Sequence, residues 1–149
     1  MVVSTRGRYA LRVLIDLAER REEGFIPLRD IVSRQGISQK YVENIMSSLS
    51  RAGLVEGVHG RGGGYRLTRA PEDYSLGEVL RLTEGDLAPV SCLEGGAAGC
   101  ERAGQCRTLP VWDRLNEIIN AYLDSVALAD LLSPAEEKEK EQEEPCTTS

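Results

Sequence analysis

The sequence of 149 residues contains no apolar run that approaches the ~20 residues of a membrane-spanning helix. Residues 1–8 lack the apolar centre of a secretory signal peptide, so we expect a chain that stays in the cytoplasm. In that compartment we expect the four cysteines to be thiols or metal ligands rather than disulfides. A hydrophobic content of 41% and a charged content of 28% are typical of a soluble, globular chain.

Catalytic groups are scarce as well. His59 is the only histidine, and the sequence offers it no evident nucleophile as a partner. No paired carboxylates occur in a recognisable pocket loop. We therefore expect neither an enzyme nor a small-molecule substrate.

A net positive charge is also missing, because the formal charge of the chain is −6. Residues 1–70 nevertheless hold 12 Arg or Lys and 7 Asp or Glu, whereas residues 71–149 hold 6 and 17. A basic first part can contact phosphates while an acidic second part stays away from them. Charge also fluctuates along chains that bind no nucleic acid, so the split alone does not decide the function.

The first predicted helix covers residues 4–20, where apolar side chains recur at a 3.6-residue period behind the capping residue Ser4. Arg6, Arg8 and Arg12 crowd its first half, where cations oppose the helix dipole. Either a negative group lies near these arginines or they form a solvated face.

Two further helices complete a helix-turn-helix pattern. A short helix follows Ile26 and ends at Gly36, which suits the left-handed position after a helix. The next helix covers residues 38–50, with Ser38 as its N-cap and Gly53 after its end. Two helices joined by a three-residue turn that contains glycine are typical of a helix-turn-helix.

Two short strands, residues 54–58 and 65–68, flank the glycine-rich segment 59–64. Glycines let such a tip adopt positive φ and approach another surface closely. A nucleotide-binding glycine loop would need a helix directly after it, and the sequence predicts none there. Because a hairpin after a helix-turn-helix is the wing of a winged helix, we expect residues 1–70 to form a winged helix-turn-helix DNA-binding domain.

Beyond residue 70, Ser75 and Glu78 match the capping box of a helix that ends at Gly85. A last helix is expected from residue 109 or 110 to residue 132. So long an apolar stripe, ~35 Å, favours packing on a second copy over burial against its own domain. The fold class is mainly α with a small β-hairpin wing. The expected parts are a linking helix and cysteine-rich loop (71–108), a dimerisation helix (109–132) and a disordered acidic tail (133–149).

The exposed face of helix 38–50 carries side chains that can contact bases. Asn and Gln pair bidentately with adenine, and Glu43 can accept from cytosine N4 while it repels phosphate. Arg61 at the wing tip suits a narrow minor groove. For an isolated helix a solvated face would be the simpler interpretation, but the position before a glycine-tipped hairpin favours DNA recognition. The predicted DNA-contacting residues are Ser38, Gln39, Lys40, Tyr41, Glu43, Asn44, His59 and Arg61.

Cys92, Cys100 and Cys106 form a C-x7-C-x5-C pattern in a loop rich in glycine and alanine. Small residues let a short loop wrap a compact group, and thiolates are ligands for iron–sulfur clusters, zinc or Cu(I). Structural zinc usually shows C-x2-C spacing, which is absent here, and a disulfide switch would use only two of the three cysteines. Three cysteines so close together are too dense for ordinary structural thiols, so the spacing favours a metal centre, with iron–sulfur ahead of zinc.

A 2Fe–2S cluster takes four protein ligands, and this loop supplies three cysteines. The fourth ligand is unknown, with Cys146, Glu94, Glu101 and a side chain of a partner subunit as candidates. An incomplete cysteine set would make the cluster labile, which suits a sensor, because cluster loss frees the loop and reshapes the adjacent helices.

Several segments together resemble the Rrf-type winged-helix regulators of bacteria, in particular their IscR-type members, which regulate iron–sulfur cluster genes. The resemblance covers residues 1–132, and the combination of motifs is highly specific. The segments that carry it are Ser4–Arg12, Gly36–Ser38, Tyr41–Glu43, Arg51–Val55 and Gly60–Tyr65.

The resemblance implies a homodimer joined by helix 109–132, and binding of double-stranded DNA through helix 38–50 and the wing. Two such helices about one DNA turn apart, ~34 Å, would recognise a pseudo-palindromic operator. In IscR-type proteins the glutamate that matches Glu43 discriminates between operator classes according to the cluster state. Their cluster-binding cysteines match Cys92, Cys100 and Cys106, as do those of NsrR-type proteins.

The chain departs from the IscR-type pattern at three places. Leu109 occupies the position of a histidine ligand, the first cysteine gap is two residues longer, and His59 matches the wing arginine while Arg61 is offset by two. The cluster type therefore stays open between 2Fe–2S and an NsrR-type 4Fe–4S cluster.

The expected function is a transcriptional regulator, in the first place a repressor, of iron–sulfur biogenesis or sulfur-metabolism genes. The alternatives within the family are an NsrR-type sensor of nitric oxide or redox state and a CymR-type repressor of cysteine metabolism, although CymR-type proteins typically lack the three cysteines. An alternative from a different class is a small zinc or redox protein that uses its helices for protein contacts.

Overall fold

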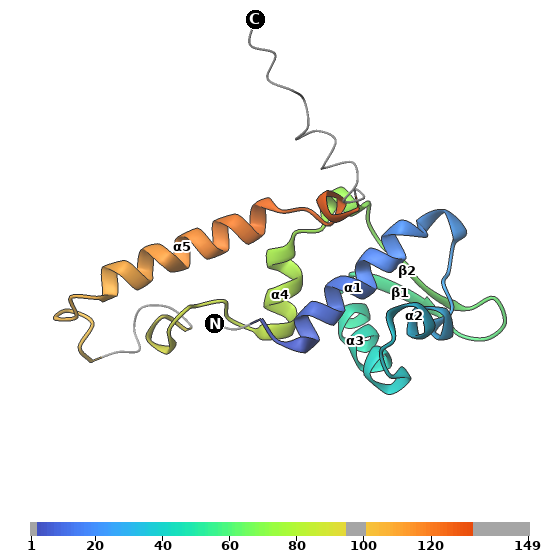
Figure 1. Cartoon of the computed structure of the whole chain (residues 1–149), viewed down its shortest axis with the longest axis horizontal. Coiled ribbons are helices and arrows are strands. Elements are labelled where there is room, and N and C mark those ends of the chain that lie inside the picture. The colour runs from blue at the N-terminus through green and yellow to red at the C-terminus, as the bar shows by residue number, and fades with distance from the viewer. Residues whose placement is uncertain (1–2, 95–100, 133–149) are drawn as a thin grey trace, which may run out of the picture.

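The computed structural model describes residues 3–94 and 101–132 (Figure 1). Within them, three helices and a hairpin come first and two further helices follow, so the predicted fold class is confirmed. The elements are α1 (Thr5–Glu19), α2 (Leu28–Gln35), α3 (Gln39–Arg51), β1 (Val55–Val58), β2 (Gly64–Leu67), α4 (Leu76–Glu84) and α5 (Leu109–Ser125), with short 3-10 turns η1 (Arg21–Glu23), η2 (Pro71–Asp73), η3 (Ser91–Leu93) and η5 (Leu128–Leu131).

Three helices begin at the serines that the sequence predicts. The Oγ atoms of Ser4, Ser38 and Ser75 each accept a hydrogen bond from the backbone N–H three residues further on. Each bond satisfies one of the donors that the start of a helix leaves unpaired. The capping box predicted at Ser75 forms only in its serine half, because the carboxylate of Glu78 accepts from Arg69 instead.

The hydrophobic core surrounds α1, which contacts α2, α3, α4, β2 and η5. One side of α1 is fully buried, and its apolar side chains there are at most 1% exposed. Burying a side chain of leucine size stabilises a fold by about 1.5–3 kcal/mol, so this face dominates the packing. The contributing side chains are Ala10, Val13, Leu14, Leu17 and Ala18 from α1, and Val42, Ile45, Met46 and Leu49 from α3.

One carboxylate is buried among these apolar side chains. Asp16 on α1 is 1% exposed, and Arg34 on α2 donates to both of its oxygens at 2.7 and 2.9 Å. Gln35 donates to it at 2.9 Å, and Arg20 lies 3.8 Å away. Burial opposes ionisation of Asp16, but these hydrogen bonds and positive charges outweigh it and lower the pKa of the carboxyl group. The contacts hold α2 against α1 ahead of the turn at Gly36, whose φ is +63°.

The wing is an antiparallel hairpin in which Val58 of β1 faces Gly64 of β2 across the glycine-rich tip. Tyr65 exchanges two backbone hydrogen bonds of 2.8 and 2.9 Å with Ile26, which precedes α2. Gly64 is needed for this approach, because a Cβ atom there would lie 2.2 Å from the carbonyl oxygen of Ile26. These hydrogen bonds attach the hairpin to the segment that leads into α2.

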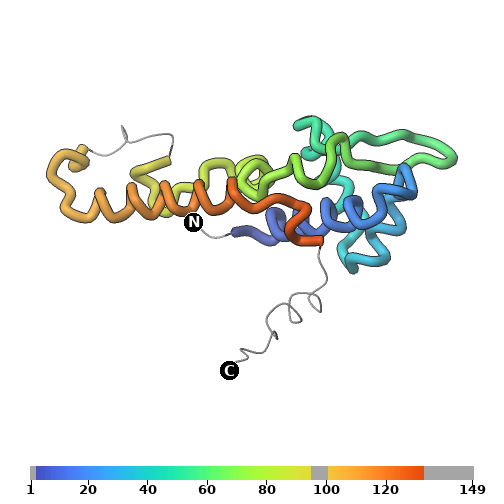
Figure 2. The backbone as a smooth tube through the Cα atoms, turned by 90° about the horizontal axis from the view of Figure 1, so that it is seen from above, coloured from blue at the N-terminus to red at the C-terminus, as the bar shows by residue number. Residues whose placement is uncertain are grey.

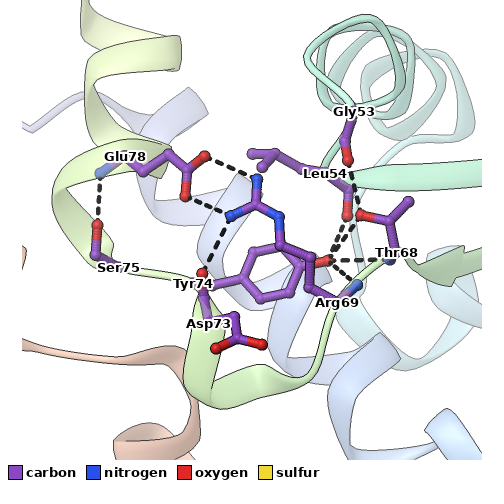
Figure 3. A network of polar contacts seen from close by, with 8 residues as sticks. All are labelled: Gly53, Leu54, Thr68, Arg69, Asp73, Tyr74, Ser75 and Glu78. Atoms are coloured by element: carbon purple, nitrogen blue, oxygen red, sulfur yellow. Dashed lines mark hydrogen bonds and ion pairs between the residues drawn. The ribbon is translucent and has the colours of Figure 1, made fainter.

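A buried tyrosine joins the base of the wing to α4 (Figure 3). The hydroxyl of Tyr74 donates to the carbonyl of Leu54 at 2.6 Å and accepts from the N–H groups of Thr68 and Arg69 at 3.1 and 3.2 Å. The guanidinium of Arg69 lies over the Tyr74 ring, 4.9 Å from its centroid, and donates to both oxygens of Glu78. This network fixes where the hairpin leaves the body of the molecule.

The last helix is shorter than the sequence predicts. α5 ends at Ser125, and Val126 has an extended backbone with φ −93° and ψ 117°. Leu128 is then buried in the core around α1, and its N–H donates to the carbonyl of Tyr74 at 2.9 Å. This burial and this hydrogen bond replace further helical turns, so the predicted helix to residue 132 is wrong beyond Ser125. The predicted tail, 133–149, lies outside the described residues.

Arg81 of α4 binds the second half of α5. Arg81 donates to both carboxylate oxygens of Asp124 at 2.7 and 2.9 Å, and to Asn120 Oδ1 at 2.8 Å. From this contact α5 extends away from the wing, so its beginning and the wing lie at opposite ends of the molecule (Figures 1 and 2).

We expect Asp16→Asn to lower the free energy of unfolding by on the order of 3 kcal/mol at neutral pH, because it leaves Arg34 without its charged partner. A carboxyl group whose pKa is lowered by folding stabilises the fold above its unfolded-state pKa of 3.8, and this contribution is lost as the pH falls through the folded-state pKa. Urea unfolding should therefore show a difference between wild type and variant that shrinks below about pH 4.

Asp30→Asn is the matched control, since Asp30 is half-exposed and its ion pair with Arg29 is long, at 3.9 Å. It should change the free energy of unfolding by less than about 0.5 kcal/mol. A difference between wild type and Asp16→Asn that stays constant from neutral to acid pH would contradict the ionised pair.

Candidate DNA-binding interface and cysteine loop

The helix-turn-helix presents the outer face of α3 to solvent. Its inner face is buried in the core, which leaves Gln39, Lys40, Glu43 and Asn44 exposed on the other side. These four are the residues of α3 that the sequence predicts as base-reading. The structure brings them together on one surface of a single helix.

Two other predicted contact residues have structural partners. Ser38 is exposed, but its Oγ atom accepts from Tyr41 N–H at 3.3 Å as the cap of α3. Tyr41 is half-buried, and its ring meets that of Tyr9 on α1 edge-on, with 5.7 Å between the centroids. Both residues therefore also hold α3 in place.

Side-chain pairs order the exposed face of α3. Gln39 Nε2 donates to Glu43 Oε1 at 3.0 Å, and Arg6 Nη1 of α1 donates to Asn44 Oδ1 at 2.8 Å. The second terminal nitrogen of Arg6 donates to Ser48 Oγ. Arg6 was not among the predicted site residues, although the crowding of arginines in the first half of α1 was a signal for it.

The partners of those arginines are neutral oxygen atoms rather than carboxylates. Arg8 donates to Thr5 Oγ1 at 3.1 Å, and Arg12 donates to the side-chain and backbone oxygens of Gln35 at 3.1 and 2.6 Å. Arg8 and Arg12 therefore form no ion pair with a carboxylate of the described residues, and phosphates of a bound duplex can meet their charge.

A groove of about 760 Å³ lies between the wing, the start of α2 and α3. His59 and Arg61 from the wing tip line it together with Glu43 of α3, and all three side chains are exposed. Arg29 at the start of α2 lines it as well and has an 87% exposed side chain. The two predicted wing residues and one predicted residue of α3, Glu43, thus line a common opening.

The cysteine loop joins α4 to α5. Cys92 lies in η3 and Cys106 lies three residues before α5, both half-buried and without a disulfide. Cys100 and Cys146 lie outside the described residues, as does any group that includes them. Among residues 3–94 and 101–132, no three side chains of His, Cys, Asp or Glu gather as metal ligands.

The thiol of Cys106 is prepared for ionisation by the start of α5. Its sulfur lies 3.3 Å from Thr108 Oγ1, and the N–H groups of Thr108 and Leu109 also point toward it. The hydroxyl contact and these two backbone donors lower the pKa of Cys106, so they favour the thiolate. Leu109 offers only its backbone N–H here, since its side chain is apolar.

The end of α4 is fixed to the start of α1. Glu84, the last residue of α4, accepts hydrogen bonds from the N–H of Ser4, at 3.0 Å, and from its hydroxyl. Gly7 allows this approach, because a Cβ atom there would lie 2.4 Å from Glu84 Oε1. The cysteine loop therefore starts next to the beginning of α1, the helix whose Arg6 binds Asn44.

A helix-turn-helix with an exposed polar helix face and a glycine-tipped hairpin beside it define a winged-helix DNA-binding protein. No helix in the described part of the chain is long and apolar enough to cross a bilayer. Residues 3–134 match the Rrf2 family, described as iron-dependent transcriptional regulators, and the chain belongs to this family.

Individual relatives agree with this assignment. The chain is 38% identical to the HTH-type transcriptional regulator IscR of Aliivibrio salmonicida over 132 residues, which are 89% of this chain and 77% of that protein. It is 36% identical to IscR of Serratia proteamaculans over 133 residues, 89% and 80% of the two chains.

Solved structures are similar as well. CymR of B. subtilis, described as its global cysteine regulator, gives a TM-score of 0.73 at 35% identity over 89% of this chain and 96% of that chain. IscR of T. potens gives 0.71 at 34% identity over 99% and 94%. The chain is therefore a DNA-binding transcriptional regulator, and it is not an enzyme.

Proposed function

We propose that this regulator is a homodimeric repressor of iron–sulfur biogenesis or sulfur-metabolism genes in the bacterial cytoplasm, and that it senses through an iron–sulfur cluster on Cys92, Cys100 and Cys106. The sensing part of the proposal rests on the positions of two cysteines in the loop. Cys92 lies in η3, on the side of α4, and Cys106 lies just before α5. Both segments would be held while a cluster is bound and released when it is lost. The iron-dependent description of the family and the IscR relatives support the same proposal.

The donor set fits a cluster. Thiolates are its usual protein ligands, and the start of α5 favours the thiolate of Cys106. When bound, the cluster would supply a group whose presence depends on iron, sulfide and oxidants. Since the side chain of Leu109 offers no donor, Glu94 and Glu101, which flank the undescribed segment, are candidates for the fourth ligand beside Cys146 and a partner side chain.

The loop is connected to the DNA-binding face through α1. Glu84 precedes the loop directly and holds Ser4 at the start of α1. Two residues further on, Arg6 holds Asn44 and Ser48 on α3. A rearrangement of the loop that moves Glu84 would therefore shift the start of α1 and, with it, the side chains that α3 presents.

DNA contact is proposed through the outer face of α3 and the wing. The proposed contact residues are Ser38, Gln39, Lys40, Tyr41, Glu43, Asn44, His59 and Arg61. The groove between α3 and the wing supports three members of this set, because Glu43, His59 and Arg61 line it together. In a dimer, the two copies of α3 would meet successive major grooves of a pseudo-palindromic operator, ~34 Å apart.

A second copy is proposed to cover α5. This helix has no buried residue, and its apolar stripe is 37–65% exposed. Arg81 of α4 contacts Asn120 and Asp124 on a different side of the helix, so the stripe has no partner among the described residues. An apolar surface of this kind marks a protein interface. The stripe consists of Val111, Leu115, Ile118 and Tyr122.

Anaerobically purified protein should contain iron and sulfide and show the visible absorption of a cluster. Cys92→Ala should lose both, because a ligand is removed. Two irons and two sulfides per chain would fit an IscR-type 2Fe–2S regulator, and four of each would fit the nitric-oxide-sensing alternative. Absence of iron after reconstitution would contradict cluster sensing and leave thiol or zinc chemistry.

Cys146→Ala removes one thiol outside the three-cysteine loop and separates Cys146 from the other candidates for the fourth ligand. It should keep the iron and sulfide content of the wild type. Loss of the cluster in Cys146→Ala would instead identify Cys146 as the fourth ligand.

Ile118→Glu should convert a dimer of 16.3-kDa chains into monomers at micromolar concentration. Both copies of a two-fold interface would carry the buried charge, so dimerisation should weaken by at least about 100-fold. Sedimentation velocity measures this directly. Glu117→Lys, an exposed change on the same helix outside the stripe, should leave the dimer intact, and an unchanged dimer in Ile118→Glu would contradict the proposed interface.

A further inference from the structure

Two side-chain pairs fix which hydrogen-bonding atoms the exposed face of α3 offers. Near its start, Gln39 Nε2 donates to Glu43 Oε1 at 3.0 Å. Further along, Arg6 of α1 donates through Nη1 to Asn44 Oδ1 at 2.8 Å and through Nη2 to Ser48 Oγ. An amide with such a partner is no longer free to turn either of its ends toward DNA.

Arg6 determines the orientation of the Asn44 amide. A guanidinium carries only donors, so the oxygen of Asn44 and not its nitrogen must face Arg6. The Nδ2 group then lies on the other side of the amide, and no described residue accepts from it. Ser48 engages the second nitrogen of the guanidinium, and Ser4, two residues before Arg6, is itself bound to Glu84. The guanidinium of Arg6 is therefore held by Ser48, and the backbone next to Arg6 is held by the contact of Ser4 with Glu84.

We propose that Arg6 is a specificity-determining positioning residue that makes Asn44 a hydrogen-bond donor to the operator. A free asparagine pairs with adenine through both ends of its amide, because the oxygen accepts from N6 while the nitrogen donates to N7. With its oxygen engaged by Arg6, Asn44 offers N–H groups, and these match the neighbouring acceptors O6 and N7 of guanine. The base opposite Asn44 is therefore guanine in preference to adenine.

The pair at the start of α3 has the opposite polarity. A carboxylate carries only acceptors, so Gln39 turns its nitrogen toward Glu43 and its oxygen away from it. Gln39 and Glu43 together offer oxygen atoms, which match the amino groups of cytosine and adenine. The helix thus presents hydrogen-bond acceptors near its start and a donor at Asn44. Removal of Arg6 should therefore change the base preference only at the position that faces Asn44.

The inference rests on the proposed placement of α3 in the major groove, and the experiment tests the two separately. The full-length wild-type protein first selects its operator from random-sequence duplexes. The ratios of Kd values for duplexes with each of the four bases at every half-site position are then measured by competition for wild type and variants. Because each ratio compares two duplexes with one preparation, partial unfolding of a variant does not change it.

At one position the wild type should favour guanine by about tenfold, and Asn44→Ala should lose this preference there alone. Arg6→Met should also lose it, because the freed amide can pair with adenine. Arg6→Lys, which can still donate to Asn44 Oδ1, should retain it. Asn44→Asp keeps the contact with Arg6 but presents an oxygen, so it should shift the same position toward cytosine or adenine.

Uniform weakening of all duplexes by Arg6→Met, with unchanged ratios and a smaller dependence on salt, would show that Arg6 contacts a phosphate and would overturn the inference. Unchanged base ratios in Asn44→Asp would overturn it as well. If the wild type selects no sequence at all, the placement of α3 fails together with the role of Arg6.

Discussion

The structure depends on the burial of α1, which touches most of the other elements. Its apolar side forms the core with α3, and its polar side chains reach three neighbours: Asp16 binds α2, Arg6 binds α3, and Ser4 binds the end of α4. Since α3 carries the proposed DNA-contacting face and α4 leads into the cysteine loop, a single helix, α1, contacts both parts of the proposed mechanism. Packed elements with discrete contacts of this kind can couple distant sites without a flexible linker.

The helices and the wing could be predicted because local signals and the core pattern agree there. Serine caps, Gly36 and the 3.6-residue period of α3 all favour one arrangement, and the structure has it. The end of α5 could not be predicted in this way. Val126 fits a continued helical stripe in sequence, but its backbone is extended in the structure, and the chain turns there so that Leu128 packs in the core around α1.

The outer face of α3 was predictable as a surface, whereas its hydrogen-bonding pattern was not. A sequence shows that Asn44 can both donate and accept, but only the position of Arg6, 38 residues earlier, shows which end is already engaged. The same holds for Glu78, whose carboxylate the capping pattern assigns to Ser75 and the structure assigns to Arg69. Such assignments depend on long-range side-chain geometry, which local patterns do not contain.

The proposed control of the DNA-binding face by the cysteine loop runs through Glu84, α1 and Arg6. Its most direct test is the Kd of one selected operator duplex, measured anaerobically by fluorescence anisotropy with cluster-loaded and cluster-free preparations of the wild-type protein. We expect the two Kd values to differ by about tenfold or more, a typical size for coupling between two sites. Equal Kd values for the two preparations would contradict the proposed control.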